Sequence, residues 1–245
     1  MDWETWKPWY DKIVLQLGIN RKADEEAARV LNSLLPEPDL DGIRNLLSGR
    51  ECVVFGAGPS LEKNLEKISK TRLFRKTIIS ADGATTAVMR HRTPEIIVTD
   101  LDGKVDDQIN AWKHGAWLVI HAHGDNIKRV SEIVPKLGER VIGTTQVRPF
   151  GKLFNFGGFT DGDRAVFMAR WLGASRIYLA GMDLGVKIGR YSGNKDPRRK
   201  SIKLRICEEL LEWLKELGTN IVDLTRAQSK PTADISAGVR CLVKK

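Results

Sequence analysis

The stretch Glu95-Ile-Ile-Val-Thr-Asp-Leu-Asp-Gly103 decides the fold class that this chain is expected to have. Its apolar, β-branched run is typical of a buried parallel strand, which is apolar on both faces. Asp100 and Asp102 follow at the carboxyl end of the strand, where open α/β sheets bind their ligands. If the chain stays extended there, both carboxylates share one side and suit Mg²⁺. The stretch alone leaves equally open a loop that caps a helix beginning at Val105.

On both sides of this stretch, apolar runs typical of strands alternate with amphipathic runs typical of helices. The alternation predicts an α/β fold with a mostly parallel sheet and helices on both faces. The expected strands are 52–55, 77–80, 95–99, 117–121, 140–144, 176–180 and 220–223. The clearest expected helices are 127–137, 163–172 and 203–217.

The first segment of the chain, residues 1–48, has a different pattern. Trp3, Trp6, Trp9 and Tyr10 recur at helical spacing, and this aromatic stripe indicates packing rather than a platform for stacking bases. A second helix is expected over 25–35, with Asp24 as its N-cap, and a short one over 40–47. We therefore expect an N-terminal helical segment, 1–48, packed on an α/β domain that spans 49–245.

Composition narrows the functional classes. The 245 residues contain no apolar run near the ~20 residues that span a bilayer, and the start lacks the pattern of a secretory signal. The three cysteines show no metal-ligand spacing and fit a reduced, cytoplasmic setting. We expect no membrane partner. Exposed tryptophans or a sheet edge would serve a homodimer, but the sequence leaves the oligomeric state open.

The net charge of +9 comes largely from one stretch, because residues 186–206 hold eight Lys or Arg and one acid, Asp196. A phosphate-rich metabolite explains a local basic loop as well as nucleic acid does. A nucleic-acid-binding protein is the weakest interpretation, since it leaves the strand-end aspartates unused. We expect no nucleic-acid partner.

Gly56-Ala-Gly58-Pro-Ser60 forms a glycine turn between an expected strand and helix. Glycine lets backbone approach a ligand closely, and a helix N-terminus attracts phosphate. The turn lacks the third glycine of the dinucleotide fingerprint, because that position holds Leu61. We favour a nucleotide phosphate contact through Gly56, Gly58 and Ser60 over a purely structural turn.

Aspartates follow several other expected strands. Asp82, Asp125 and Asp183 each stand at a strand end, which together with Asp100 and Asp102 indicates a metal-dependent anion site. Near Asp125, His121 and His123 have the i, i+2 spacing of transition-metal ligands, yet nothing completes such a site. A substrate-contacting turn is favoured there, with Asp125 or Asn126 capping the next helix.

The loop Asn155-Phe-Gly-Gly-Phe-Thr-Asp-Gly-Asp-Arg164 precedes a strong helix. Thr160 and Asp161 fit the N-cap position, where acidic residues complement the helix dipole. In the functional interpretation this loop forms a wall of the site and brings Asp161 or Asp163 near the metal.

These motifs resemble a known family. Ala81-Asp-Gly-Ala84, the segment 93–102 and Phe159-Thr-Asp-Gly-Asp-Arg-Ala165 resemble the catalytic domain of thiamin pyrophosphokinases. Gly56-Ala-Gly-Pro-Ser-Leu61, Gly181-Met-Asp-Leu-Gly185 and the following 188–192 are more similar to archaeal 6-hydroxymethyl-7,8-dihydropterin diphosphokinases. The resemblance covers nearly all of residues 51–223.

The resemblance implies a Rossmann-like enzyme that uses ATP and Mg²⁺ to transfer diphosphate to a hydroxymethyl group. Asp100 and Asp102 match the metal-binding aspartates, Asp82 matches the aspartate of the Asp-Gly-Gly turn, and Asp161 matches the Thr-Asp aspartate. Thr99 and Gly103 depart from the thiamin pattern, which favours a pterin as acceptor.

The remaining expected contacts fall into two groups. The cations expected to close over the triphosphate as a mobile lid are Lys187, Arg190, Arg198, Arg199 and Lys200. The residues expected near the acceptor are His123, Asp125, Asn126, Asn155 and Asp183. Two alternatives stay open: thiamin diphosphokinase, and a sialyl-type nucleotide-sugar transferase, which shares the Gly-x-Gly-Pro-Ser-Leu motif.

Overall fold

A single parallel sheet of eight strands organises the computed structural model, which describes residues 1–184 and 196–225. The strand order is β6-β5-β4-β3-β2-β1-β7-β8, and every pairing between described strands is parallel. The expected α/β fold is therefore confirmed. The strands are β1 (Glu51–Phe55), β2 (Thr77–Ala81), β3 (Ile96–Thr99), β4 (Trp117–Ala122), β5 (Val141–Thr145), β6 (Leu153–Phe154), β7 (Arg176–Ala180) and β8 (Ile221–Asp223).

The strand order reverses beside β1. The chain builds the sheet outward from β1 to β6, and then returns to place β7 on the free side of β1. Open α/β sheets bind ligands at such a switch point, outside the carboxyl ends of the strands. The turn after β1 and the turn after β7 therefore face each other at this edge.

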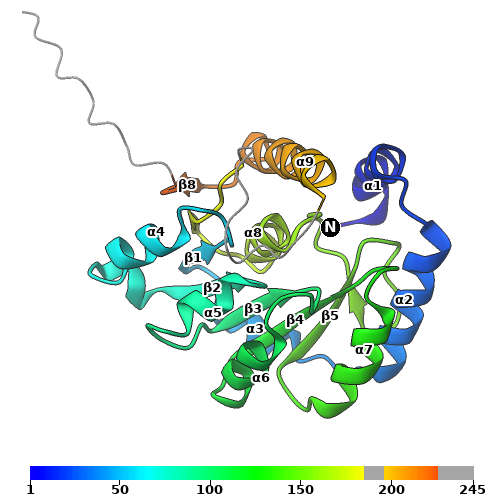
Figure 1. Ribbon diagram of the computed structural model, residues 1–245, viewed down its shortest axis with the longest axis horizontal. Coiled ribbons are helices and arrows are strands. Elements are labelled where there is room, and N and C mark those ends of the chain that lie inside the picture. Colours follow the sequence, from blue (N-terminus) through cyan, green and yellow to red (C-terminus); the bar gives the residue numbers. More distant parts are fainter. Residues whose placement is uncertain (185–195, 226–245) are drawn as a thin grey trace, which may run out of the picture.

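Helices cover both faces of the sheet. Figure 1 shows α8 and α9, with α1 beside them, on one side of the sheet, and α6 on the other. Helix α2 runs along the β5 side and contacts α7. The helices are α1 (Trp3–Leu17), α2 (Arg21–Leu34), α3 (Leu40–Asn45), α4 (Leu61–Ile68), α5 (Ala84–Val88), α6 (Val105–Lys113), α7 (Ile127–Ile133), α8 (Asp161–Trp171) and α9 (Pro197–Glu216).

Strand alternation divides the apolar interior between the two faces. In β1, Val53 and Phe55 point to a small core under α4 and α5. Cys52 and Val54 point to the main core, which includes residues of α8 and α9. Both sets are fully buried, which explains why residues 52–55 of β1 are all apolar.

The N-terminal helices share the main core. Trp6 is completely buried and packs edge-on against Phe167 of α8, with ring centroids 6.4 Å apart. Trp9 packs against Trp213 of α9 at 5.4 Å. The aromatic stripe thus serves packing, as expected, while the domain boundary at residue 48 stays a prediction.

Several expected element boundaries differ from the structure, and one strand is missing from the prediction. Helix α2 begins at Arg21, because Asn20 caps it by accepting from the backbone N–H groups of residues 22 and 23, so Asp24 lies inside the helix. Helix α9 begins at Pro197 rather than 203, since Asp196 caps it. Strand β6 is missing from the prediction because two residues carry no detectable period.

No helix in the described parts of the chain combines the length and the apolarity needed to cross a membrane.

Candidate active site

Three carboxylates meet at the carboxyl edge of the sheet. Asp82 follows β2, Asp100 follows β3, and Asp161 is the first residue of α8. Carboxylate oxygens of the three lie within 4.8 Å of one another. The neighbouring register of Ala81 and Val98 brings the first two together, and α8, packed across β1, β2 and β3, brings the third. Such hard oxygen donors suit Mg²⁺.

Asp82 is held in place by a network of donors. Its Oδ1 accepts from Thr99 Oγ1 at 2.7 Å and from Gln108 Nε2 at 2.9 Å. The backbone N–H of Gly103 donates to the same oxygen at 3.3 Å. Asp82 and Leu101 also have positive φ angles, 39° and 64°. Residues other than glycine rarely adopt positive φ angles, and such backbone conformations cluster at functional sites where the surrounding structure enforces them.

Bringing the three carboxylates together disfavours their charged forms. Burial, and then repulsion from Asp100, raises the pKa of Asp82 from 3.8 to about 6. Burial, followed by repulsion from Asp100 and Asp82, raises the pKa of Asp161 well above its ordinary value. The buried Arg164 offsets only part of this repulsion. A divalent cation would remove the rest, so the donor set fits a metal in chemistry and in charge.

We expect Asp82→Asn to raise the thermal unfolding midpoint of the protein in EDTA at pH 8. Because the folded state raises this pKa, it binds the proton more tightly than the unfolded chain does. Ionisation therefore destabilises the fold progressively as pH rises from 3.8 to about 6, and fully above that. The amide removes the charge and keeps Oδ1 as an acceptor.

The measurement is a series of melting curves from pH 4 to pH 8, for the wild type and the variant. The advantage of Asp82→Asn should shrink toward pH 4, where the wild-type carboxyl is protonated too. Asp106→Asn, an exposed change on α6, is the matched control. An advantage that stays the same at every pH would contradict the assignment of the charge penalty to Asp82.

Asp102 lies outside this group of three. The positive φ of Leu101 turns the chain between Asp100 and Asp102, so the extended backbone that would put both on one side is absent. Asp102 is half-buried, its N–H donates to Asp100 Oδ1 at 3.2 Å, and its charge adds to the raised pKa of Asp82. A direct metal contact for Asp102 stays a prediction.

The start of α8 separates the roles of its two aspartates. Asp163 is fully buried, and its carboxylate accepts from the N–H groups of Phe159 and Thr160, each at 2.7 Å. Thr160 is therefore the N-cap residue and Asp163 completes its capping box, while Asp161 joins the carboxylate cluster. The sequence left these two alternatives open, and the cap geometry decides between them.

The glycine turn lies at the switch point and is locked to the turn after β7. The N–H of Gly58 donates to Gly181 O at 2.8 Å, and a Cβ on Gly58 would collide with the Asp183 carboxylate. Asp183 Oδ2 accepts from Ser60 N at 3.0 Å and from Ser60 Oγ at 2.8 Å. Asp183 thus braces the turn. Its expected substrate contact, and the phosphate contacts of Gly56, Gly58 and Ser60, stay predictions.

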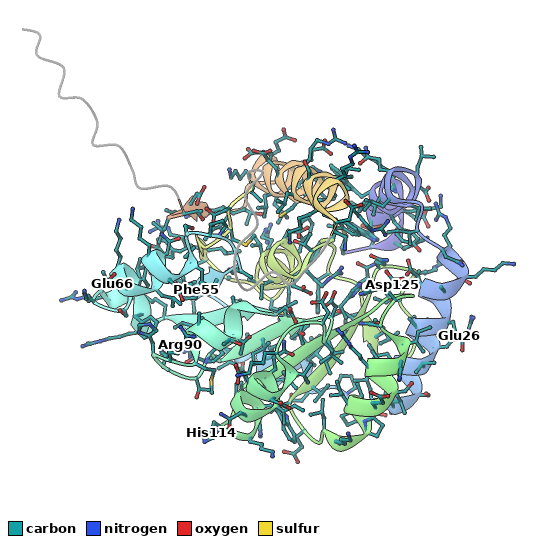
Figure 2. All side chains as sticks on the ribbon, in the orientation of Figure 1. Glu26, Phe55, Glu66, Arg90, His114 and Asp125 are labelled. Atoms are coloured by element: carbon teal, nitrogen blue, oxygen red, sulfur yellow. The ribbon has the colours of Figure 1, made fainter. Side chains whose placement is uncertain are left out.

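The residues expected near the acceptor divide into cavity-lining and structural ones. His123 and Asp125 line a cavity that also includes Asp100 and Asp161. His123 Nε2 is 3.3 Å from Asp100 Oδ2, and Asp125, beside α2 in Figure 2, is 88% exposed.

Asn126 and Asn155 are buried braces. Asn126 Nδ2 donates to the carbonyls of Asp100 and His121 at 2.8 and 2.7 Å, which ties the ends of β3 and β4 together. Asn155 Nδ2 donates to Val147 O at 3.1 Å and supports the loop before α8. The Nδ2 groups of both side chains donate to backbone carbonyls. Substrate contacts for these two residues stay predictions.

Cations from α9 line the same cavity. They are Arg199, Lys200 and Lys203. Arg199 and Lys200 were expected in a mobile lid, but they belong to the first turn of α9, and Arg199 Nη1 donates to Leu17 O at 2.8 Å. The expectation of a loop through Lys200 is therefore wrong. Arg198 is exposed, and Lys187 and Arg190 lie outside the described residues.

Known proteins resemble this chain over most of its length. The family described as 6-hydroxymethylpterin diphosphokinase MptE-like matches residues 27–189. The chain belongs to this family. A protein of Methanothermobacter thermautotrophicus called 6-hydroxymethyl-7,8-dihydropterin pyrophosphokinase is 45% identical over 228 residues, 89% of this chain and 97% of its own length. Proteins with the same name from Pyrococcus furiosus and Methanocaldococcus jannaschii are 41% and 37% identical, over 96% and 94% of their lengths.

Membership in the MptE-like family confirms the resemblance to pterin diphosphokinases that the motifs indicated. The order of these motifs along the chain thus identified the family correctly, although Asp102 lies outside the group of three carboxylates. The thiamin enzymes share the aspartate pattern, and the glycine turn and the Gly-Met-Asp-Leu-Gly segment separated the two groups.

Sequence reasoning missed two residues of this MptE-like site. Gln108, which orients Asp82, gives no sequence signal because it is one polar residue in an amphipathic helix. Asp24 does give one: its spacing from Ala28 and Leu31 puts it on the buried face of α2. A carboxylate on an apolar face indicates a partner or a ligand.

Proposed function

We propose that this chain transfers diphosphate from ATP to the hydroxymethyl group of 6-hydroxymethyl-7,8-dihydropterin and releases AMP, with Mg²⁺ as the metal. The observation that carries the proposal is the cluster of Asp82, Asp100 and Asp161, because two of its members, Asp100 and Asp161, line a cavity together with Lys200 and Lys203. Family membership and the printed names of the three relatives support the acceptor.

In this reaction the protein must chiefly position the reacting groups and neutralise phosphate charge, with little covalent chemistry of its own. The substrate hydroxyl oxygen attacks the β-phosphorus of ATP, loses its proton, and the bond from that phosphorus to the α-phosphate oxygen breaks. Asp82, Asp100 and Asp161 would hold Mg²⁺, which supplies neutralisation of phosphate charge when bound. Lys200 and Lys203 face the same cavity and would neutralise the remaining phosphate oxygens.

Alignment is the second task of the protein. The fold fixes the carboxylates on strand ends and on a helix start, which are rigid elements. The glycine turn at the switch point would contact the nucleotide through backbone N–H groups. We also propose a cytoplasmic location and a place in the synthesis of a methanopterin- or folate-type cofactor, since the acceptor is a pterin alcohol.

The test is AMP release from ATP and Mg²⁺ with hydroxymethyldihydropterin or thiamin as the acceptor. We expect AMP with the pterin and none above background with thiamin. AMP with thiamin alone would replace this proposal with a thiamin diphosphokinase. Thermal stabilisation by cytidine nucleotides but not by ATP would favour a nucleotide-sugar transferase.

A further inference from the structure

Besides Gln146, two buried polar side chains line the cavity that Asp100 and Asp161 also line. They are Asp24 of α2, 2% exposed, and His121 of β4, 3% exposed. The sequence assigned Asp24 to a helix cap and put His121 at the start of a substrate-contacting turn. The proposed chemistry at the metal uses neither of them, so their place in the cavity requires another explanation.

The carboxylate of Asp24 has one acceptor position left. Its Oδ2 accepts from Tyr10 Oη at 2.8 Å and from Gln146 Nε2 at 2.7 Å. Its Oδ1 accepts from the N–H of Gly124 at 2.9 Å. A carboxylate offers about four lone-pair positions. Three of them are occupied, by donors from α1, from the turn after β5 and from the turn after β4. Asp24 itself lines the cavity, so a ligand there could donate to the remaining acceptor position on Oδ1.

His121 offers a second acceptor. The Thr144 hydroxyl donates to the carbonyl of Ile120 at 3.1 Å, so its single hydrogen is already used. The contact of His121 Nδ1 with Thr144 Oγ1 at 3.2 Å then makes Nδ1 the donor. The neutral ring therefore has its lone pair on Nε2. Among the described residues this buried atom has no hydrogen-bond partner of ordinary geometry, although the Gln146 side chain lies near enough to interact with the ring. A buried acceptor of this kind is costly unless a ligand pairs with it.

We propose that Asp24 and His121 bind the pterin ring through its edge of N–H groups, the 2-amino group and the neighbouring N3–H. This rests on the proposed function and names the acceptor subsite within it. Two acceptors in one cavity fit a heterocycle with adjacent donors. They disfavour a phosphate, because a phosphate at neutral pH offers chiefly hydrogen-bond acceptors. The nucleotide phosphates are therefore expected beside Lys200 and Lys203, which line the same cavity.

Other residues that line the cavity support the same orientation. Phe159, partly exposed, lines it and offers an apolar ring beside the heterocycle. Asp100 and Asp161 line it too. A pterin held at its amino edge by Asp24 and His121 extends its hydroxymethyl group toward the carboxylate cluster.

The first experiment replaces the His121 acceptor and measures two affinities separately. The oxidised analogue 6-hydroxymethylpterin is titrated by its fluorescence, and ATP with Mg²⁺ is titrated by calorimetry. His121→Asn keeps a donor for Thr144 and removes the acceptor at Nε2. We expect its Kd for the pterin to rise about tenfold or more, with the Kd for ATP unchanged.

Two variants serve as matched controls. His121→Gln carries an oxygen that reaches the position of Nε2, and we expect it to recover part of the pterin affinity. His114→Asn makes the same substitution at an exposed histidine that follows α6, on the side of the sheet that α6 covers (Figure 2), and we expect wild-type affinity. Melting curves establish that each variant is folded.

The second experiment uses the ligand itself. In 6-hydroxymethyllumazine a carbonyl replaces the 2-amino group. We expect the wild type to bind this analogue about tenfold more weakly than the pterin, and Asp24→Asn to lose most of that preference. Equal binding of both compounds by the wild type, or an equal loss of pterin and ATP in His121→Asn, would overturn the subsite.

The two levels of the proposal fail differently. If the wild type releases AMP with the pterin but His121→Asn binds the pterin as the wild type does, the subsite is wrong and the proposed function stands. If the wild type discriminates pterin from lumazine as expected but releases no AMP, the subsite stands and the transfer reaction is wrong.

Discussion

Replacing Asp100 by asparagine should lower the rate of AMP release by about 10²-fold or more, as does the loss of other groups that stabilise transition-state charge. Asp100 is the central carboxylate of the cluster, since its charge raises the pKa of both Asp82 and Asp161. Asn keeps the size of the side chain and removes one of the anionic oxygens that suit Mg²⁺. Asp161→Asn should have an effect of similar size, because Asp161 completes the same group of three.

The measurement is initial velocity against Mg²⁺ concentration with saturating ATP and pterin. A lost metal ligand should raise the Mg²⁺ concentration that gives half-maximal velocity, and a merely misfolded variant would not show this shift. Asp106→Asn, exposed on the first turn of α6, should leave both quantities unchanged. Wild-type turnover in both Asp100→Asn and Asp161→Asn would exclude the cluster as the metal site.

The largest effect on stability is expected for Trp6→Ala, with a loss of about 3–5 kcal/mol in the free energy of unfolding. Trp6 is fully buried, packs against Phe167, and donates from Nε1 to the carbonyl of Gln146 at 2.9 Å. Alanine leaves a cavity between α1 and the main core and leaves that buried carbonyl without its donor.

Chemical denaturation measures this change, and Leu15→Ala is its control on the same helix. Leu15 is 85% exposed, so its truncation should change the free energy of unfolding by no more than about 0.5 kcal/mol. Trp6→Phe keeps most of the apolar volume and loses the N–H, so it should fall between the two. If Trp6→Ala unfolds at the same denaturant concentration as Leu15→Ala, the N-terminal helices are not part of the main core.

The Trp6 contact also connects stability to the acceptor subsite. Gln146 accepts from Trp6 through its carbonyl and donates to Asp24 through its side chain. Loosening α1 should therefore weaken pterin binding before it affects ATP. Comparing the two affinities in Trp6→Phe, which is expected to remain folded, checks this connection.

Local patterns were enough to predict the parallel sheet. Residues 52–55 and 96–98 are apolar at each position because helices cover both faces of the sheet. Helix starts were less reliable where two polar residues compete for the cap. Asn20 caps α2 and Asp24 does not, since Asp24 packs toward Tyr10 and Gln146. That preference depends on residues distant in sequence, which a local pattern does not include.

The sequence by itself determined that aspartates stand at the carboxyl ends of parallel strands, because the end of each continuous apolar run fixes where the strand ends. Only the tertiary structure decided which of them meet. The positive φ of Leu101 turns Asp102 away from the cluster of Asp82, Asp100 and Asp161. The packing of α8 across β1, β2 and β3 brings Asp161 into that cluster. Likewise, the carboxylate of Asp24 reaches Gly124, a hundred residues away along the chain. Such contacts follow from the packing of the whole core, whereas strand ends follow from their own few residues.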